Sequence, residues 1–182
     1  MVAQVARAAI ALAVAMVLPS AALSPAWAAA PIKIGLVHPF TGPLSPVGIE
    51  ATDRFEQYFD EHGKTVAGRD IQILKEDSAG IPAQAMERVR RLVERDRVDL
   101  LTGITSSAEA YAVRDYIDRR QIPLVIMGNA GANDITDKRG SPYIFRTSFA
   151  NYQDNAPFGG YACQQLGYKK VAVMFSDFVT GY

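Results

Sequence analysis

Short apolar runs alternate with longer stretches of helical periodicity from about residue 30 to the end of the chain. In the longer stretches apolar side chains recur at helical spacing, whereas the short runs, rich in β-branched residues, are typical of buried strands. The predicted strands are 32–37, 70–76, 98–101, 123–127, 143–147 and 170–175, and the predicted helices are 49–62, 82–93, 106–119 and 152–166. Because this alternation is typical of parallel sheets, we predict a doubly wound α/β protein.

A doubly wound sheet binds its ligand beyond the carboxyl ends of its strands. That rule selects four loops, at 38–48, 77–81, 103–108 and 128–134. The sequence stops at Tyr182, just after the last predicted strand, and a strand at the edge of a parallel sheet needs a covering helix. We therefore expect the chain to be part of a longer protein.

The N-terminus has the features of a secretory signal peptide in their usual order. Arg7 is the first charge, an apolar stretch covers 8–18, and small residues lead to an Ala-Trp-Ala site that ends at Ala28. The apolar stretch is shorter than the roughly 20 residues that span a bilayer, which disfavours the alternative of a membrane anchor. We predict that residues 1–28 are a signal peptide. Since no cysteine near Ala28 can carry a lipid, the mature protein is expected to be free in a periplasm.

Composition disfavours several classes of function. The 19 basic residues balance the 19 acidic ones, so no long-range field favours nucleic acid, and no nucleic-acid partner is expected. Cys163 is the only cysteine, and the only histidines, His38 and His62, lie on different elements, so neither an internal disulfide nor a metal site is expected. No glycine-rich nucleotide motif or nucleophile elbow occurs, so no cofactor is expected and the chain is not predicted to be an enzyme.

Charged residues of both signs are interleaved between positions 87 and 97. The run is basic enough to suggest an interaction patch, but Glu87 and Arg91 are four residues apart, as are Arg90 and Glu94. Ion pairs at this spacing stabilise an exposed helix surface. We therefore predict a solvated, salt-bridged helix face rather than a binding patch.

Two of the selected loops have compositions suited to a ligand. The loop 102–107 joins a buried strand to a helix N-terminus, where free backbone N–H groups and the helix dipole favour an anion. Ser106 or Ser107 adds a hydroxyl donor there, although the alternative is that these serines only cap the helix. The loop 128–133 is rich in small residues that let a ligand approach the backbone closely, with an ordinary turn as the alternative.

A series of short segments along the chain shares a common pattern with one protein family. The segments are 31–37, 39–43, 68–73, 76–78, 82–85, 103–107, 122–124, 135–136, 143–146 and 171–177. Behind a signal peptide, this ordered series resembles the periplasmic branched-chain amino-acid-type binding proteins of ABC transporters. The resemblance implies two α/β lobes whose cleft closes on a small solute and presents it to an inner-membrane permease. It places the N-terminal ligand-binding lobe, incomplete, at 29–148 and the start of the second lobe at 149–182.

The same resemblance assigns site residues. Ser107 matches the serine that holds the ligand carboxylate, and Asn129 and Ala130 match a loop whose backbone contacts the ligand. Gly131 stands where the amino-acid binders have a threonine for the ligand ammonium, and Val47 stands where they often have a tyrosine. The carboxylate half of the site is thus retained, while the ammonium half is not matched. The predicted ligand-binding residues are Ser107, Ser106, Asn129, Ala130, Gly131, Val47 and His38.

We therefore predict the substrate-binding component of an ABC transporter for branched-chain amino acids or related small carboxylates, including aromatic acids. The alternative is an extracytoplasmic solute sensor that passes its closed state to a signalling partner. An enzyme on the same scaffold is disfavoured because the sequence holds no catalytic constellation.

Overall fold

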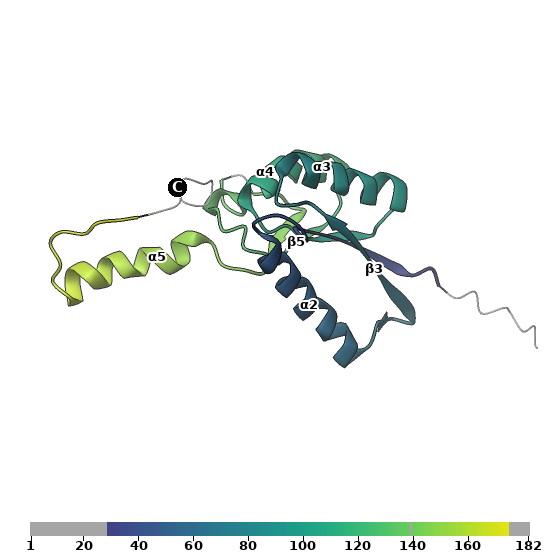
Figure 1. Cartoon of the computed structure of the whole chain (residues 1–182), viewed down its shortest axis with the longest axis horizontal. Coiled ribbons are helices and arrows are strands. Elements are labelled where there is room, and N and C mark those ends of the chain that lie inside the picture. Colours follow the sequence, from purple (N-terminus) through teal and green to yellow (C-terminus); the bar gives the residue numbers. More distant parts are fainter. Residues whose placement is uncertain (1–28, 139, 175–182) are drawn as a thin grey trace, which may run out of the picture.

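A six-stranded sheet forms the centre of the protein in the computed structural model, which describes residues 29–138 and 140–174 (Figure 1). The strands are β1 (Ile32–His38), β2 (Thr65–Val66), β3 (Arg69–Asp77), β4 (Leu100–Gly103), β5 (Leu124–Ile126) and β6 (Ile144–Arg146). Their order in the sheet is β2-β3-β1-β4-β5-β6. Every neighbouring pair is parallel except β2 and β3, which are antiparallel. The predicted doubly wound α/β class is confirmed.

Helices cover both faces of this sheet. They are α2 (Ser45–His62), α3 (Pro82–Arg91) with its π-helical continuation η1 (Leu92–Asp96), α4 (Ser107–Arg120), the 3-10 turn η2 (Asn133–Ile135), and α5 (Asn151–Gly160) with its π-helical continuation η3 (Tyr161–Gln165). In Figure 1, α3 and α4 lie side by side on one face, α2 lies on the opposite face, and α5 projects away from the sheet. No helix in the described part of the chain is long and apolar enough to cross a membrane.

The direction of winding reverses at β1, which pairs with β3 on one side and with β4 on the other. The chain moves from β1 through α2 to β3, then crosses back through α3 to β4 and continues outward to β5 and β6. Because crossovers between parallel strands are right-handed, the two directions of winding place their helices on opposite faces. The switch point therefore lies between the carboxyl ends of β1 and β4, the usual place for a ligand in such sheets.

The hydrophobic core lies between the sheet and the layer of α3 and α4. The apolar stripe predicted for the second helix is buried as expected, with Ala85 and Val89 fully inaccessible, and Pro82 occupies the first helical turn. The core also includes buried side chains from the strands and α4, namely Val37, Leu101, Val113, Ile117, Leu124 and Ile126. This rigid layer holds the carboxyl edge of β1, β4 and β5 in place.

Two features differ from the prediction. The short strand β2 was missed because its two exposed residues are too few for an alternating pattern; it forms a hairpin with β3 through Ala67 and Gly68, both at positive φ. The strand predicted at 170–175 is wrong for residues 170–174, which have no regular structure, while Phe175 lies outside the described residues. Val173 is exposed to 77%. Apolar, β-branched composition alone does not make a strand, because a strand also needs a hydrogen-bonding neighbour.

Candidate functional site

Four loops meet at the carboxyl edge of the sheet, as the sequence predicts. The backbone amide of Ile104 donates to Val37 O over 2.8 Å, and that of Ser78 donates to His38 O over 3.0 Å. Gly103 allows the closest approach, since a Cβ atom there would lie 2.2 Å from Val37 O and 3.0 Å from His38 Cδ2. Its φ of +108° is also a conformation that suits glycine. The ends of β1 and β4 are therefore joined tightly at the switch point.

Asp77 braces the two loops on the β3 side of this edge. Its carboxylate accepts hydrogen bonds from Phe40 N (2.8 Å), Ala79 N (2.8 Å) and Thr41 Oγ1 (2.6 Å). Partial burial acts to raise the pKa of Asp77, but these hydrogen bonds outweigh it and lower the pKa below the ordinary value. The loops 38–48 and 77–81 are thus fixed to each other by one ionised side chain.

Ser106 caps α4 by a reciprocal pair of hydrogen bonds. Its Oγ accepts from Glu109 N over 3.2 Å, and Glu109 Oε2 accepts from Ser106 N over 2.9 Å. Such a capping box satisfies only part of the first turn of a helix, which leaves the amides of Ser107 and Ala108 without an intrahelical acceptor. The capping alternative is therefore realised for Ser106, and the next two amides are the donors suited to an anion.

Ser107 connects α4 to the loop 128–134. It is fully buried, and its Oγ accepts a hydrogen bond from Ala132 N over 3.0 Å. Because the hydroxyl acts there as an acceptor, its own proton is left to donate. Gly128 packs against the preceding loop so closely that a Cβ atom would lie 2.5 Å from Ile104 O. Ser107 can thus hold the loop 128–134 in place and also donate a hydrogen bond to a ligand.

Arg146 holds the loop 128–134 from the end of β6, a role that the sequence did not reveal. Its Nη1 donates to Ala130 O (3.0 Å) and to Ala132 O (2.9 Å), and its Nη2 bonds Thr136 Oγ1 (2.5 Å). Burial lowers the pKa of this guanidinium from its ordinary value. The one sequence signal that could have revealed this brace is an arginine at the end of a predicted strand close to a loop of small residues.

The N-terminus of α5 holds the same loop from the other side. Asn151 N donates to Gly131 O over 2.9 Å, and Tyr152 N donates to Asn133 Oδ1 over 3.0 Å. Ala130 and Gly131 are buried by these contacts, whereas Asn129 is exposed. The loop is therefore a fixed wall of the edge rather than an ordinary mobile turn.

His38 lies at the end of β1, fully buried against α2. Its Nδ1 is 2.9 Å from Thr52 Oγ1, and that hydroxyl donates its proton to Gly48 O over 2.8 Å. Nδ1 therefore carries the imidazole proton and Nε2 is an acceptor. Burial lowers the pKa of His38 to about 4, so the ring is neutral at pH 7. Val47, in the first turn of α2, is half-buried on this side.

Buried polar atoms without partners gather at this edge. Within the described residues they are His38 Nε2 at the end of β1, Thr105 Oγ1 just after β4, Glu109 Oε1 in the first turn of α4, and Ser148 Oγ just after β6. A buried polar group without a partner costs about 1–3 kcal/mol, so such groups are rare outside functional regions. Their concentration here, together with the amides of α4, marks the edge as the candidate ligand site. No group of His, Cys, Asp or Glu in the described residues could hold a metal ion.

Comparison with known proteins identifies relatives of this arrangement. Residues 31–182 match the profile of the family described as "Periplasmic binding protein". "Leu/Ile/Val-binding protein homolog 6" of Brucella abortus (strain 2308) is 32% identical over 151 residues, which cover 82% of this chain and 38% of that protein. The "ABC transporter substrate-binding protein from Sphaerobacter thermophilus" superimposes with a TM-score of 0.76 at 40% identity, over 83% of this chain and 41% of the other.

A further related structure is that of a protein in complex with a ligand. It is a solute binding protein of an ABC transporter from Rhodopseudomonas palustris BisB5, in complex with 3,4-dihydroxy benzoic acid. It has a TM-score of 0.77 and 33% identity, over 82% of this chain and 40% of that one. The chain thus spans about two fifths of the length of the proteins it matches.

Proposed function

Because the chain belongs to the periplasmic binding protein family, we propose that it forms the ligand-binding N-terminal lobe of a substrate-binding protein of an ABC transporter. The proposal rests on the arrangement at the carboxyl ends of β4 and β5. There the first amides of α4 and the hydroxyl of Ser107 lie beside a rigid loop of small residues.

The ligand that this edge suits is a small carboxylate. A helix N-terminus with free N–H groups stabilises an anion, and a serine hydroxyl adds a hydrogen bond of about 1.5–3 kcal/mol to a charged acceptor. Gly131 has no side chain that could accept a hydrogen bond from an ammonium group. Of the two classes named for the relatives, Leu/Ile/Val and dihydroxybenzoic acid, this residue favours the aromatic acid.

The remaining parts of the proposal concern the whole protein. We propose that residues 29–148 form the first lobe and that 149–182 begin the second, because α5 projects away from the sheet (Figure 1). The signal peptide proposed for residues 1–28 lies outside the described residues. A cleaved signal would place the protein in a periplasm, and its partner would be the inner-membrane permease that receives the solute.

Replacing Ser107 by alanine is expected to weaken carboxylate binding ten-fold or more. The variant loses the hydroxyl donor to the ligand and the contact that fixes Ala132 N, and one hydrogen bond to a charged group is worth about 1.5–3 kcal/mol. Nuclear magnetic resonance (NMR) titration of the purified chain with sodium benzoate measures the dissociation constant. Ser141→Ala is the matched control, because Ser141 precedes β6 and therefore lies at the amino-terminal ends of the strands, away from the proposed site. Equal affinities for Ser107→Ala and Ser141→Ala would remove Ser107 from the site.

A further inference from the structure

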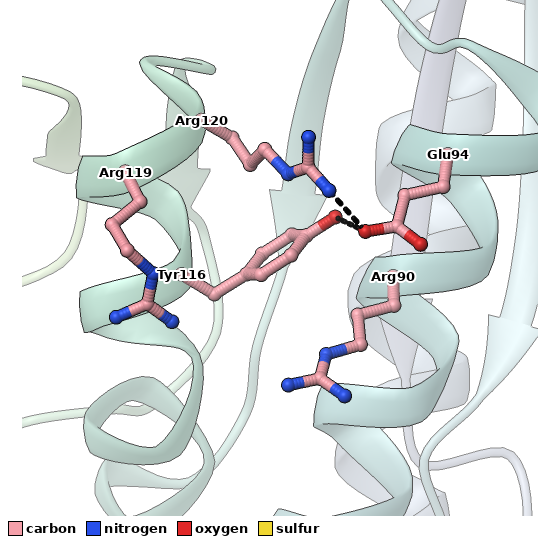
Figure 2. Close-up of a pocket in the computed structure, with 5 residues that line it drawn as sticks. All are labelled: Arg90, Glu94, Tyr116, Arg119 and Arg120. Atoms are coloured by element: carbon pink, nitrogen blue, oxygen red, sulfur yellow. Dashed lines mark hydrogen bonds and ion pairs between the residues drawn. The ribbon is translucent and has the colours of Figure 1, made fainter.

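A concave site lies away from the carboxyl edge, where α3 with η1 runs beside the last turns of α4. It is a cavity of about 440 Å³ lined by Arg90, Glu94, Tyr116, Arg119 and Arg120 (Figure 2). Three of these residues, Tyr116, Arg119 and Arg120, lie on α4 and follow Ser107 by nine to thirteen positions. At 1.5 Å per residue, the cavity is about 14–20 Å along the helix from the proposed solute site. We refer to these five residues as the basic α3–α4 pocket.

The sequence predicts ion pairs within α3, but the structure pairs these residues across elements. Arg91 Nε lies 3.2 Å from Glu76 Oε1 of β3, rather than pairing with Glu87. Glu94 bonds Arg120 of α4, rather than pairing with Arg90. The predicted solvated, salt-bridged face is present, since Glu87, Arg90, Arg91 and Glu94 are all exposed. The predicted pairing within the helix is wrong, because the neighbouring strand and helix supply nearer partners. Arg90 forms no ion pair within 4 Å among the described residues, although its charge helps to lower the pKa of the nearby Glu94 carboxyl.

The pocket carries an excess of positive charge. It has three arginines and one glutamate, a formal charge of +2 (three minus one). Glu94 accepts a hydrogen bond from Tyr116 Oη over 3.0 Å and bonds Arg120, and these bonds lower the pKa of its carboxyl, so it is ionised. Within the described part of the chain, Arg119 has no ion-pair partner. Arg90 and Arg119 thus form no direct ion pair within the described residues, and one glutamate does not balance the three arginines.

Tyr116 fixes the geometry of the pocket. The ring is almost fully buried, and the guanidinium carbons of Arg90 and Arg120 lie 5.7 Å and 5.4 Å from its centroid. Figure 2 shows Arg119 and Arg90 on either side of the Tyr116 ring, coming from the two different helices. Cations in the last turn of a helix are favoured by its dipole, but that effect does not account for charges from two helices converging on one cavity.

We propose that the basic α3–α4 pocket binds a divalent phosphate-class oxyanion between Arg90 and Arg119. A dianion matches the excess charge of +2, and planar guanidinium groups bond the oxygens of such an anion in pairs. Glu94 already shows that this surface holds an anionic oxygen, in contact with Tyr116 and Arg120. The cavity is open and larger than one phosphate, so the dianion can be the free ion or the phosphomonoester group of a lipid such as phosphatidic acid. The site is separate from the proposed solute site.

NMR titration of the purified chain with sodium phosphate at pH 7.5, against sodium chloride at equal ionic strength, tests this. We expect saturable shifts at residues 90–94 and 116–120 with phosphate alone. Arg90→Gln and Arg119→Gln should each weaken binding at least five-fold, whereas Glu94→Gln should strengthen it because it removes the competing carboxylate. Arg54→Gln is the matched control, since Arg54 is an exposed arginine on α2 that pairs with Glu50. It should leave the affinity unchanged.

Sedimentation with vesicles that contain phosphatidic acid, whose phosphomonoester headgroup can carry two negative charges, distinguishes the source of the phosphate group. If free phosphate shifts these amides and Arg119→Gln weakens its binding, the proposed pocket is supported and its ligand is the free ion. If the parent chain binds vesicles but not free phosphate, and Arg119→Gln abolishes the vesicle binding, the proposed pocket is supported and its ligand is a lipid headgroup. If neither probe binds, or if both bind Arg90→Gln and Arg119→Gln as tightly as the parent chain, the proposal is overturned.

Discussion

Replacing Gly103 by alanine is expected to lower the free energy of unfolding by at least about 4 kcal/mol, a large part of the roughly 5–15 kcal/mol that stabilises a typical domain. Two effects add. The residue has φ of +108°, which costs a non-glycine residue about 1–3 kcal/mol. The new Cβ atom would also lie 2.2 Å from Val37 O, a backbone atom that cannot move without separating β1 from β4.

Urea unfolding followed by circular dichroism measures this effect. Gly63→Ala is the matched control, because Gly63 has φ of +87° but no atom within 4 Å of its built Cβ position. This control should show the conformational cost alone, about 1–3 kcal/mol. If the two variants lost the same stability, the close approach of β1 and β4 at the switch point would be contradicted.

Acidification from pH 6.5 to pH 4 is expected to cost the protein about 3 kcal/mol through His38 alone. The pKa of His38 is about 4 in the folded protein because the ring is buried, and 6.5 is its ordinary value in an unfolded chain. As pH falls through 6.5 the unfolded state takes up a proton that the folded state does not accept until about pH 4. Stability therefore falls across this window, by about 1.4 kcal/mol for each unit of difference between the two pKa values.

The matched variants for this test are His38→Asn and His62→Gln. Asparagine keeps an N–H donor for Thr52 but does not titrate, so the pH dependence of its unfolding free energy between 6.5 and 4 should be shallower than in the parent chain by about 3 kcal/mol. His62 is exposed and bonds only its own helix, at Tyr58 O, so its variant should keep the parent slope. Equal slopes for His38→Asn and the parent chain would show that a neutral, buried His38 is not what limits stability in acid.

Much of the fold follows from local pattern. Apolar spacing predicted the helix around Val89, a capping serine predicted the helix that begins at Ser107, and short apolar runs predicted most of the parallel strands. Each of these signals lies within a single segment of the chain. The meeting of four loops at one edge then follows from topology. Strand β2 and the residues 170–174 were not predicted correctly, since their state depends on a hairpin turn in one case and on a neighbouring strand in the other.

The site was predictable in position but not in its contacts. Ser106 and Ser107 were placed at the start of a helix at the right edge, yet Ser107 bonds Ala132, which is 25 residues away. Arg146 braces the same loop from another strand, and Glu94 pairs with Arg120 on another helix. These contacts depend on how elements pack, and spacing along one helix or loop does not encode them.

The central claim is that the carboxyl edge of this lobe binds a small carboxylate, and NMR titration of the purified chain tests it most directly. A micromolar binder gains about 8 kcal/mol, and if this lobe supplies half, its own dissociation constant is about 1 mM. We predict that sodium benzoate binds with about that constant and shifts the amides of residues 103–110 and 128–134, while the uncharged benzyl alcohol does not. Failure of benzoate to shift these amides at 20 mM, or equal binding of benzyl alcohol, would contradict the account.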